Sequence, residues 1–277
     1  MIDEYKIYLE HQLETLSRVP DSFVDLTMTS PPYDDMNENF EVIQRNGMRT
    51  YTGYSWDFKK LAEELYRVTK MGGVVVWVVN DPVVDGSKSL ASAYQKIYFR
   101  KCGFDILDTM IYEKNGCSMP DKYRYLQSFE YMIVLTKGRP KTVNFIKDRK
   151  NRFPNRWGEG RTVREKDGRQ TARKKIKSEA FGRRFNIWRY NTGAGYSTKD
   201  KVAFEHPAIF PEKLVADHVN SWTNEGDVVY DPFAGSGTTQ KVCEVLNRKC
   251  FGSEISKEYF SVSDKRKKAN DKKLKLF

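Results

Sequence analysis

The chain has few cysteines and no long apolar run, and both absences narrow the classes of protein to which it can belong. Its 277 residues include four cysteines, none of them in a C-x-x-C pair. The sequence therefore predicts reduced thiols rather than a zinc site, another metal site or a disulfide framework. The chain also shows no charged-then-apolar leader and no apolar stretch long enough to span a bilayer, so we expect an intracellular protein.

Acidic residues are scarce relative to basic ones. The sequence has 48 lysines and arginines against 37 aspartates and glutamates, a formal net charge of +11, and its pI is about 9.3. Such an excess indicates an acidic partner, most commonly nucleic acid, although a basic protein with a solvated surface has the same composition. With 39% hydrophobic residues, a chain of this length can bury a full core in one domain, with or without an insert.

Short apolar runs alternate with stretches of helical spacing over most of the chain. Leu61, Leu65 and Val68, for example, share one helical face. The runs predict buried strands at residues 23–28, 74–79, 131–135, 228–230 and 250–253. Strands that alternate with helices predict a largely parallel sheet with covered faces, which is the α/β class.

Residues 138–200 differ in character from the stretches on either side. Apolar periodicity fades there, and aromatic residues such as Trp157, Phe185 and Trp188 are interleaved with basic ones. A solvated loop with a few packed residues would fit, but basic and aromatic side chains together favour a module that faces nucleic acid. The residues predicted to contact DNA are Arg152, Arg156, Arg161, Arg164, Arg173, Lys174, Lys175, Arg183 and Arg184.

A glycine-rich turn follows the predicted strand at 228–230. Glycines let the chain bend tightly and let a ligand approach the backbone. Glu254 ends the next predicted strand, where a carboxylate accepts hydrogen bonds from both ribose hydroxyls. No G-K-[ST] follows and the third glycine of the dinucleotide fingerprint is absent, so a nucleoside without a pyrophosphate fits best. The predicted cofactor-binding residues here are Asp231, Pro232, Phe233, Ala234, Gly235, Ser236, Gly237, Thr238, Thr239 and Glu254.

A second motif, Ser-Pro-Pro-Tyr at residues 30–33, directly follows the first predicted strand. Pro31 and Pro32 fix the backbone and remove two donors, which leaves a rigid corner rich in carbonyl oxygens. These oxygens and the Ser30 hydroxyl can accept the two protons of an amino group, and Tyr33 offers a flat face for a base. An ordinary Pro-Pro turn is the alternative.

Together these motifs resemble those of the DNA N4-cytosine/N6-adenine methyltransferase family. In that family S-P-P-Y is the catalytic motif and D-P-F-A-G-S-G-T-T is the S-adenosylmethionine motif. The catalytic motif comes first here, as in the permuted β-type order, and the sequence is most similar to the N4-cytosine members of restriction-modification systems. Further similar stretches are residues 115–116, 129–137, 206–214 and 251–256.

The resemblance implies a circularly permuted, Rossmann-like methyltransferase fold, with a mixed, mostly parallel sheet, helices on both faces and an inserted target-recognition region. The implied domains are a catalytic half at 1–137, the basic insert at 138–200 and an S-adenosylmethionine-binding half at 201–277. The implied partner is double-stranded DNA, with a companion restriction endonuclease and no membrane. We further expect a monomer or homodimer in the cytoplasm, nucleoid-associated, of a prokaryote or phage.

Ser30 favours cytosine N4 as the methylated atom, because the family's adenine members usually have Asp or Asn at this place. Cytosine C5 methylation needs a nucleophilic thiol, usually after a proline, and no cysteine here follows a proline. Asp81 after the second predicted strand is either a donor to cytosine N3 or part of a plain Asn-Asp-Pro turn. An adenine N6 enzyme, an RNA or protein amine methyltransferase and an inactive DNA-binding relative remain open.

The sequence departs from the family's pattern at two places in the implied cofactor site. His11 stands where relatives often carry an Asp that contacts the cofactor adenine, so His11, Gln12 or a backbone group must take over that contact. Phe210 stands where many relatives have Lys, and we interpret Phe210 and Pro211 as part of the wall of the site.

Overall fold

The computed structural model of the protein contains two compact units, Met1–Asn144 with Ile187–Phe277, and Phe145–Asn186. The second unit lies within the range predicted for the basic insert, and both ends of that range belong to the first unit. The structure describes residues 2–32, 35–36, 42–43, 56–84, 86–116, 122–157, 162–172, 177–193 and 195–274.

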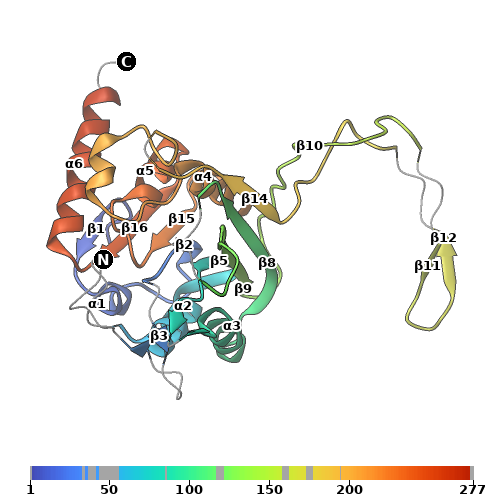
Figure 1. Ribbon diagram of the computed structural model, residues 1–277, viewed down its shortest axis with the longest axis horizontal. Coiled ribbons are helices and arrows are strands. Elements are labelled where there is room, and N and C mark those ends of the chain that lie inside the picture. Colours follow the sequence, from blue (N-terminus) through green and yellow to red (C-terminus); the bar gives the residue numbers. More distant parts are fainter. Residues whose placement is uncertain are drawn as a thin grey trace. The chain divides into compact units, whose positions relative to one another are not determined.

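An eight-stranded sheet forms the centre of the first unit (Figure 1). Only the contacts of β9 with β5 and β8 are antiparallel, so the sheet is mixed and mostly parallel, which confirms the predicted fold class. In spatial order the strands are β1 (Ile7–Leu9), β16 (Lys249–Glu254), β15 (Val228–Asp231), β2 (Val24–Thr29), β5 (Thr69–Val79), β9 (Phe129–Thr136), β8 (Asp105–Lys114) and β14 (Ile187–Tyr190).

Helices cover both faces of this sheet, with α1, α2 and α3 on one face and α4 and α5 on the other (Figure 1). The long helix α6 packs against β1 and the short 3-10 helix η1. In the described part of the chain, no helix is both long enough and apolar enough to cross a membrane. The helices are α1 (Gln12–Ser17), α2 (Phe58–Val68), α3 (Ala91–Cys102), η1 (Lys201–Glu205), α4 (Glu212–Trp222), α5 (Thr238–Val245) and α6 (Lys257–Leu274).

The helix α2 and the strand β5 follow one another without a turn. The helix buries the face that carries Leu61, Leu65 and Val68, as its spacing predicts. Gly72 and Gly73 are helix breakers, but the helix already ends at Val68, because the Thr69 hydroxyl donates to the carbonyl of Leu65 and Thr69 pairs with β2. The glycines instead lie in an irregularity of β5, where Gly72 has a φ of +81°.

Trp77 on β5 is the largest buried side chain between the sheet and the layer of α2 and α3. Its ring contacts those of Phe58 on α2 and Phe99 on α3, with centroids 6.1 and 5.2 Å away. The indole N–H donates to the side chain of Gln95 over 2.8 Å, so the one polar atom of this ring is satisfied although it is buried. This packing fixes the end of β5 relative to its neighbours, and the functional motifs lie at that edge of the sheet.

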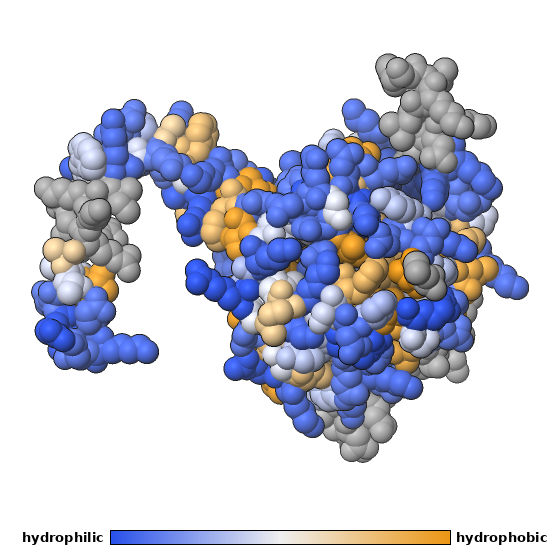
Figure 2. Space-filling model, turned by 180° about the vertical axis from the view of Figure 1, so that it is seen from behind, coloured by the Kyte–Doolittle hydropathy of each residue, from blue (hydrophilic) through white to orange (hydrophobic). Residues whose placement is uncertain are grey.

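The second unit is small and built from short antiparallel pairs. Strands β10 (Arg149–Lys150) and β13 (Phe181–Gly182) form one pair, and β11 (Thr162–Arg164) and β12 (Gln170–Ala172) form another. Its surface is mostly hydrophilic, with isolated hydrophobic residues (Figure 2). Trp188 and Tyr190, by contrast, belong to the first unit, where both are buried on β14.

Candidate active site

The two predicted motifs meet at the edge of the sheet where the parallel strands β2, β15 and β16 end. The hydroxyl of Thr29, the last residue of β2, donates to the carboxylate of Asp231, the last residue of β15, over 2.7 Å. Asp231 also accepts hydrogen bonds from the Thr239 hydroxyl and the Phe233 amide. Burial raises the pKa of Asp231, while these three hydrogen bonds act in the opposite direction. One buried carboxylate thus joins the Ser-Pro-Pro corner to the glycine-rich turn.

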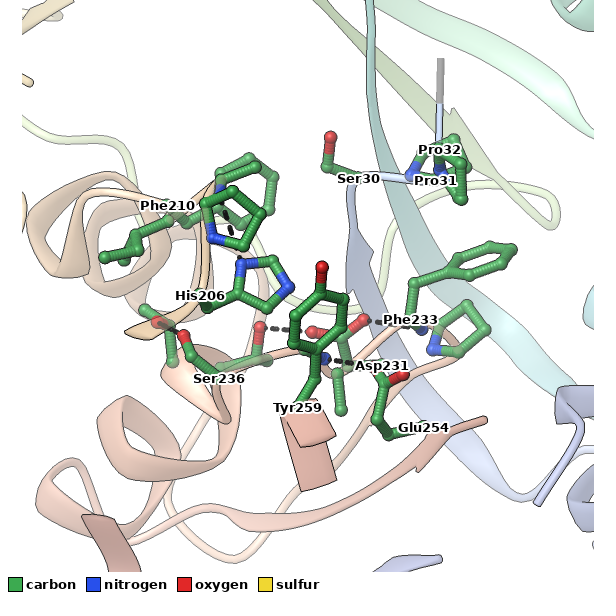
Figure 3. Close-up of a pocket in the computed structure, with 18 of the residues that line it drawn as sticks. Ser30, Pro31, Pro32, His206, Phe210, Asp231, Phe233, Ser236, Glu254 and Tyr259 are labelled. Atoms are coloured by element: carbon green, nitrogen blue, oxygen red, sulfur yellow. Dashed lines mark hydrogen bonds between the residues drawn. The ribbon is translucent and has the colours of Figure 1, made fainter. Parts of the chain in front are cut away.

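A cavity of about 670 Å³ lies over this junction and is lined by residues of both motifs (Figure 3). Gly237 and Pro211 are not in its wall, and Tyr33 lies outside the described residues. The predicted site residues that do line it are His11, Ser30, Pro31, Pro32, Phe210, Asp231, Pro232, Phe233, Ala234, Gly235, Ser236, Thr238, Thr239 and Glu254.

The turn between β15 and α5 needs its two glycines. Gly235 and Gly237 have φ values of +51° and +75°, in the left-handed region that favours glycine. A Cβ at Gly235 would lie 3.0 Å from Nε2 of His206, and one at Gly237 would lie 3.0 Å from Cβ of Ser263. Both the backbone conformation and the close neighbours therefore exclude larger residues.

Glu254, the last residue of β16, faces the cavity beside this turn. Its carboxylate accepts from the backbone amides of Gly235 and Ser256, each over 2.8 Å. Burial raises the pKa of Glu254, although the two amides stabilise the charged form. A carboxylate held at a strand end beside a glycine turn fits the ribose of a nucleoside cofactor.

His11 and Gln12, the side chains predicted as candidates to contact the cofactor adenine, both line the cavity. Nδ1 of His11 accepts from the amide of Leu13, so His11 caps the start of α1. The side-chain nitrogen of Gln12 is buried and has no hydrogen-bond partner among the described residues. A buried amide with unused hydrogen-bonding capacity in the cavity wall fits a base-binding role, so the residues present are compatible with S-adenosylmethionine.

His206 and Tyr259 also line the cavity, and the sequence did not single out either residue. The two rings are in contact, with centroids 4.2 Å apart. Nδ1 of His206 accepts from the amide of Ala208, and burial lowers the pKa of His206 to about 4. The ring is therefore neutral at physiological pH, with its hydrogen assigned to Nε2, the atom that faces Gly235. His206 belongs to the family-like stretch 206–214, which was the available signal.

Arg266 on α6 supports the glycine-rich turn from behind and is 1% exposed. Its guanidinium donates to the Ser236 carbonyl over 2.7 Å and to the Thr238 hydroxyl over 3.1 Å. The carboxylates of Asp200 and Glu212 balance its charge at 3.1 and 3.0 Å. Nothing in the sequence distinguishes this arginine from the lysines beside it, which are exposed or partly exposed.

The other half of the cavity contains the Ser-Pro-Pro corner. Asn80 and Pro82 at the end of β5 line this half, but Asp81 does not. The carboxylate of Asp81 accepts from both the amide and the hydroxyl of Ser92 at the start of α3, over 2.7 and 2.8 Å. These contacts favour the turn interpretation of Asp81, and its role as a donor to cytosine N3 stays a prediction.

An ion pair forms another part of the cavity wall. Nζ of Lys114, at the end of β8, lies 2.7 Å from Oε1 of Glu130 on β9, and both residues line the cavity. Asn115 follows Lys114 and accepts from the amide and the hydroxyl of Thr192, another lining residue. A pair of charges that is largely removed from water is costly unless it is well paired, and the short contact between Lys114 and Glu130 meets this requirement. Asn115 and Glu130 belong to the family-like stretches 115–116 and 129–137, but the sequence did not indicate the pairing of Lys114 with Glu130.

In the second unit, arginine side chains lie over exposed aromatic rings. The guanidinium of Arg183 is 4.0 Å from the ring centre of Phe145, and those of Arg152 and Arg156 lie over Phe153 at 5.4 and 5.7 Å. Arg164 is exposed on β11, while Arg184 pairs with the carboxylate of Asp148. The other predicted DNA contacts lie outside the described residues: Arg161, Arg173, Lys174 and Lys175.

The sheet order and the nucleoside site at its edge define the class of S-adenosylmethionine-dependent methyltransferases, and solved structures share this fold. One is the cytosine-N4-specific PvuII DNA methyltransferase, with a TM-score of 0.67 and 19% identity over 95% of this chain and 88% of that one. Another is a complex of M1.HpyAVI with SAM, with a TM-score of 0.57 and 19% identity over 94% of this chain and 97% of that one.

Sequence comparison gives the family. The model of the N6 and N4 methyltransferases, described as DNA methylase, matches residues 24–265, so the chain belongs to this family. It is similar to the orphan methyltransferase M.BamHII of Bacillus amyloliquefaciens, with 51% identity over 90% of this chain and 91% of that relative. The type II methyltransferase M.BglII of Bacillus subtilis is 27% identical over 93% of this chain and 67% of its own length. The protein is thus an S-adenosylmethionine-dependent DNA methyltransferase, as predicted.

Proposed function

We propose that this DNA methyltransferase acts on the N4 amine of cytosine in double-stranded DNA, on a base turned out of the helix. The observation that carries the proposal is Ser30, a hydroxyl on the cavity wall beside two prolines. The hydrogen bond between Thr29 and Asp231 joins the residue before Ser30 to the start of the glycine-rich turn. Family members that act on adenine usually have Asp or Asn in the place of Ser30.

The residues of the corner would prepare the amine for transfer. S-adenosylmethionine supplies a methyl group that is already activated by its sulfonium, so alignment is the main task of the protein. The cytosine amine is a poor nucleophile because its lone pair is delocalised into the ring. The Ser30 hydroxyl and the Pro31 carbonyl would accept its two hydrogens, which favours a tetrahedral nitrogen with the lone pair directed at the methyl group. The methylated nitrogen is cationic and loses one proton to a weak base.

The cavity also supports extrusion of the target base, because a base stacked in a duplex cannot enter a recess between strand ends. Turning a base out costs a few kcal/mol. Phosphate contacts from the second unit would offset part of this cost, and its arginines and exposed aromatic rings have the required chemistry. Tyr33, outside the described residues, remains the predicted stacking partner of the extruded base.

The wider biological context extends the same proposal. Relatives carry names of type II methyltransferases, which fits a modification enzyme with a companion restriction endonuclease. The relative that shares 51% identity is instead called an orphan methyltransferase. The companion endonuclease, the choice between monomer and homodimer, and the cytoplasmic, nucleoid-associated location stay predictions.

The base can be tested by sequencing DNA from cells that express the protein with a method that distinguishes modified bases. Recurrent N4-methylcytosine in one short sequence is the expected result, and the same cells with a Ser30→Ala variant should lack it. N6-methyladenine would replace the cytosine proposal by the adenine alternative. Labelled methyl transfer to RNA or protein but not to duplex DNA would overturn the choice of substrate. Cofactor binding without any transfer would indicate an inactive relative.

A further inference from the structure

The loop between β8 and β9 exposes aromatic residues at the edge of the sheet that carries the cavity. Its described residues are 115–116 and 122–128; among them the side chain of Tyr125 is fully exposed, Tyr123 is 83% exposed and Leu126 is 54% exposed. Lys122 and Arg124 alternate with them. A single exposed apolar residue is ordinary, but three within four positions form a small apolar surface with cations beside it. We call residues 122–126 the rim segment.

Both ends of the loop are parts of the cavity wall. Lys114 at its start and Glu130 just after its end form the ion pair described above, and the Lys114 amide donates to the Ser128 carbonyl over 2.7 Å. The side-chain nitrogen of Gln127 donates to the side-chain oxygen of Asn80, another lining residue. Arg124 in turn donates to the carbonyl of Gly86. The rim segment is therefore held beside the opening of the cavity, next to the end of β5.

The chemistry of the rim segment matches nucleic acid at a site of base extrusion. An aromatic ring stacks on any base, so exposed aromatics combined with basic residues are typical of surfaces that bind nucleic acids. When a base leaves the duplex, its neighbours lose a stacking partner, and proteins commonly insert an apolar or aromatic side chain at such steps. Lys122 and Arg124 have the charge that attracts phosphates. A protein partner with an uncharged surface would gain no attraction from these two positive charges.

We propose that the rim segment contacts DNA directly and that Tyr125 stacks on a base beside the position that the target base leaves. This contact rests on the proposed extrusion of the base. It belongs to the first unit and is separate from the contacts assigned to the arginines of the second unit. It adds a residue that positions the DNA at the opening of the cavity without touching the reacting atoms.

Substitution of Tyr125 tests the proposal because stacking needs the ring and not the hydroxyl. We expect Tyr125→Ala to raise KM for unmethylated substrate DNA about tenfold, while Tyr125→Phe stays within about twofold of the wild type. Tyr5→Ala is the matched control. Tyr5 is 57% exposed and precedes β1, an outermost strand on the far side of the sheet from β8. Cofactor affinity by calorimetry and the melting temperature should not change in any of the three. An unchanged KM in Tyr125→Ala would overturn the proposal.

Cross-linking separates this contact from the chemistry of the reaction. DNA that contains 5-bromodeoxyuridine is irradiated with the full-length protein, and cross-linked peptides are identified by mass spectrometry. Cross-links to residues 122–126 are expected, whichever base is methylated. Cross-links confined to residues 145–186 would overturn the proposal and leave the rim segment as a surface for a protein partner. If no base of the same DNA accepts a labelled methyl group while residues 122–126 still cross-link, the proposed function fails and the DNA contact stands.

Discussion

Ser30 and the two prolines after it line the cavity, and in the proposed function the Ser30 hydroxyl accepts one hydrogen of the amine. Alanine at this position would remove an acceptor for one amine hydrogen while leaving the backbone of the corner in place. We therefore expect Ser30→Ala to lower kcat by at least about a hundredfold, in the range found when one polar contact to a transition state is removed. Cofactor affinity, measured by calorimetry, should change less than about twofold.

Threonine is the matched control for this prediction because it keeps the hydroxyl. Ser30→Thr should retain more turnover than Ser30→Ala under the same conditions. Equal losses in both variants would show that the shape of the corner matters rather than its hydroxyl. An alanine variant with normal turnover would remove Ser30 from the mechanism.

Burial of the single residue His206 makes the free energy of unfolding depend on pH. Its pKa is lowered to about 4 in the folded protein by burial, whereas a histidine in the unfolded chain titrates near 6.5. The neutral ring therefore contributes its full stability above pH 6.5, and this contribution is lost as the pH falls from 6.5 toward 4. At pH 5 the loss amounts to about 2 kcal/mol of the free energy of unfolding.

Urea unfolding at pH 7.5 and pH 5 measures this effect. The drop in unfolding free energy between the two pH values should be smaller in a His206→Gln variant than in the wild type. Asp231 and Glu254, whose pKa values are raised, act in the opposite direction, but they are present in both proteins and cancel in the comparison. The same drop in both proteins would contradict the assignment.

Among the secondary-structure elements, α6 supports the glycine-rich turn that is predicted to bind the cofactor. The guanidinium of Arg266 donates to the Ser236 carbonyl and pairs with two carboxylates at the same time. A lysine cannot reproduce this forked set of contacts with a single ammonium group. Arg266→Lys should weaken S-adenosylmethionine binding about tenfold in calorimetry. Lys268→Ala, an exposed change on the same helix, is the control and should leave cofactor affinity intact. Normal cofactor affinity in Arg266→Lys would show that the turn holds its shape without the fork.

Elements also show how far the sequence predicts the structure. Local patterns predicted the strands that end at Thr29 and Asp231 and the order of the two motifs, because these depend on neighbouring residues. The place of β14 beside β8 was missed: Trp188 and Tyr190 alternate with exposed residues in a basic context, and their burial depends on a strand about 75 positions earlier in the chain. Arg266, His206 and the pair of Lys114 with Glu130 were missed for the same reason, since each acts through distant partners.

For the whole molecule, the basic excess should appear as salt dependence of DNA binding. Each phosphate contact that is lost reduces the slope of log Kd against log salt by about 0.9. Replacement of Arg152, Arg156 and Arg183 by alanine should therefore weaken binding and reduce the slope by about two to three. Binding is measured by fluorescence anisotropy at several salt concentrations.

A triple alanine variant with the same loss of charge serves as the control. Arg100, Lys101 and Lys249 are at least partly exposed and lie by the amino ends of β8 and β16, away from the edge that carries the cavity. This variant should keep the slope of the wild type. Equal slopes in all three proteins would mean that the positive charge of the second unit does not contact DNA.

The hydrogen bond between Thr29 and Asp231 joins residues 202 positions apart, and this separation has a consequence for synthesis. Strand β15 lies between β2 and β16, and β1 pairs only with β16 in the sheet. A growing chain on the ribosome therefore makes the Ser-Pro-Pro corner and its neighbour β5 well before β15, which carries Asp231. The site is completed only after residue 254 has left the exit tunnel. Chains released before residue 254 is made should therefore not modify DNA.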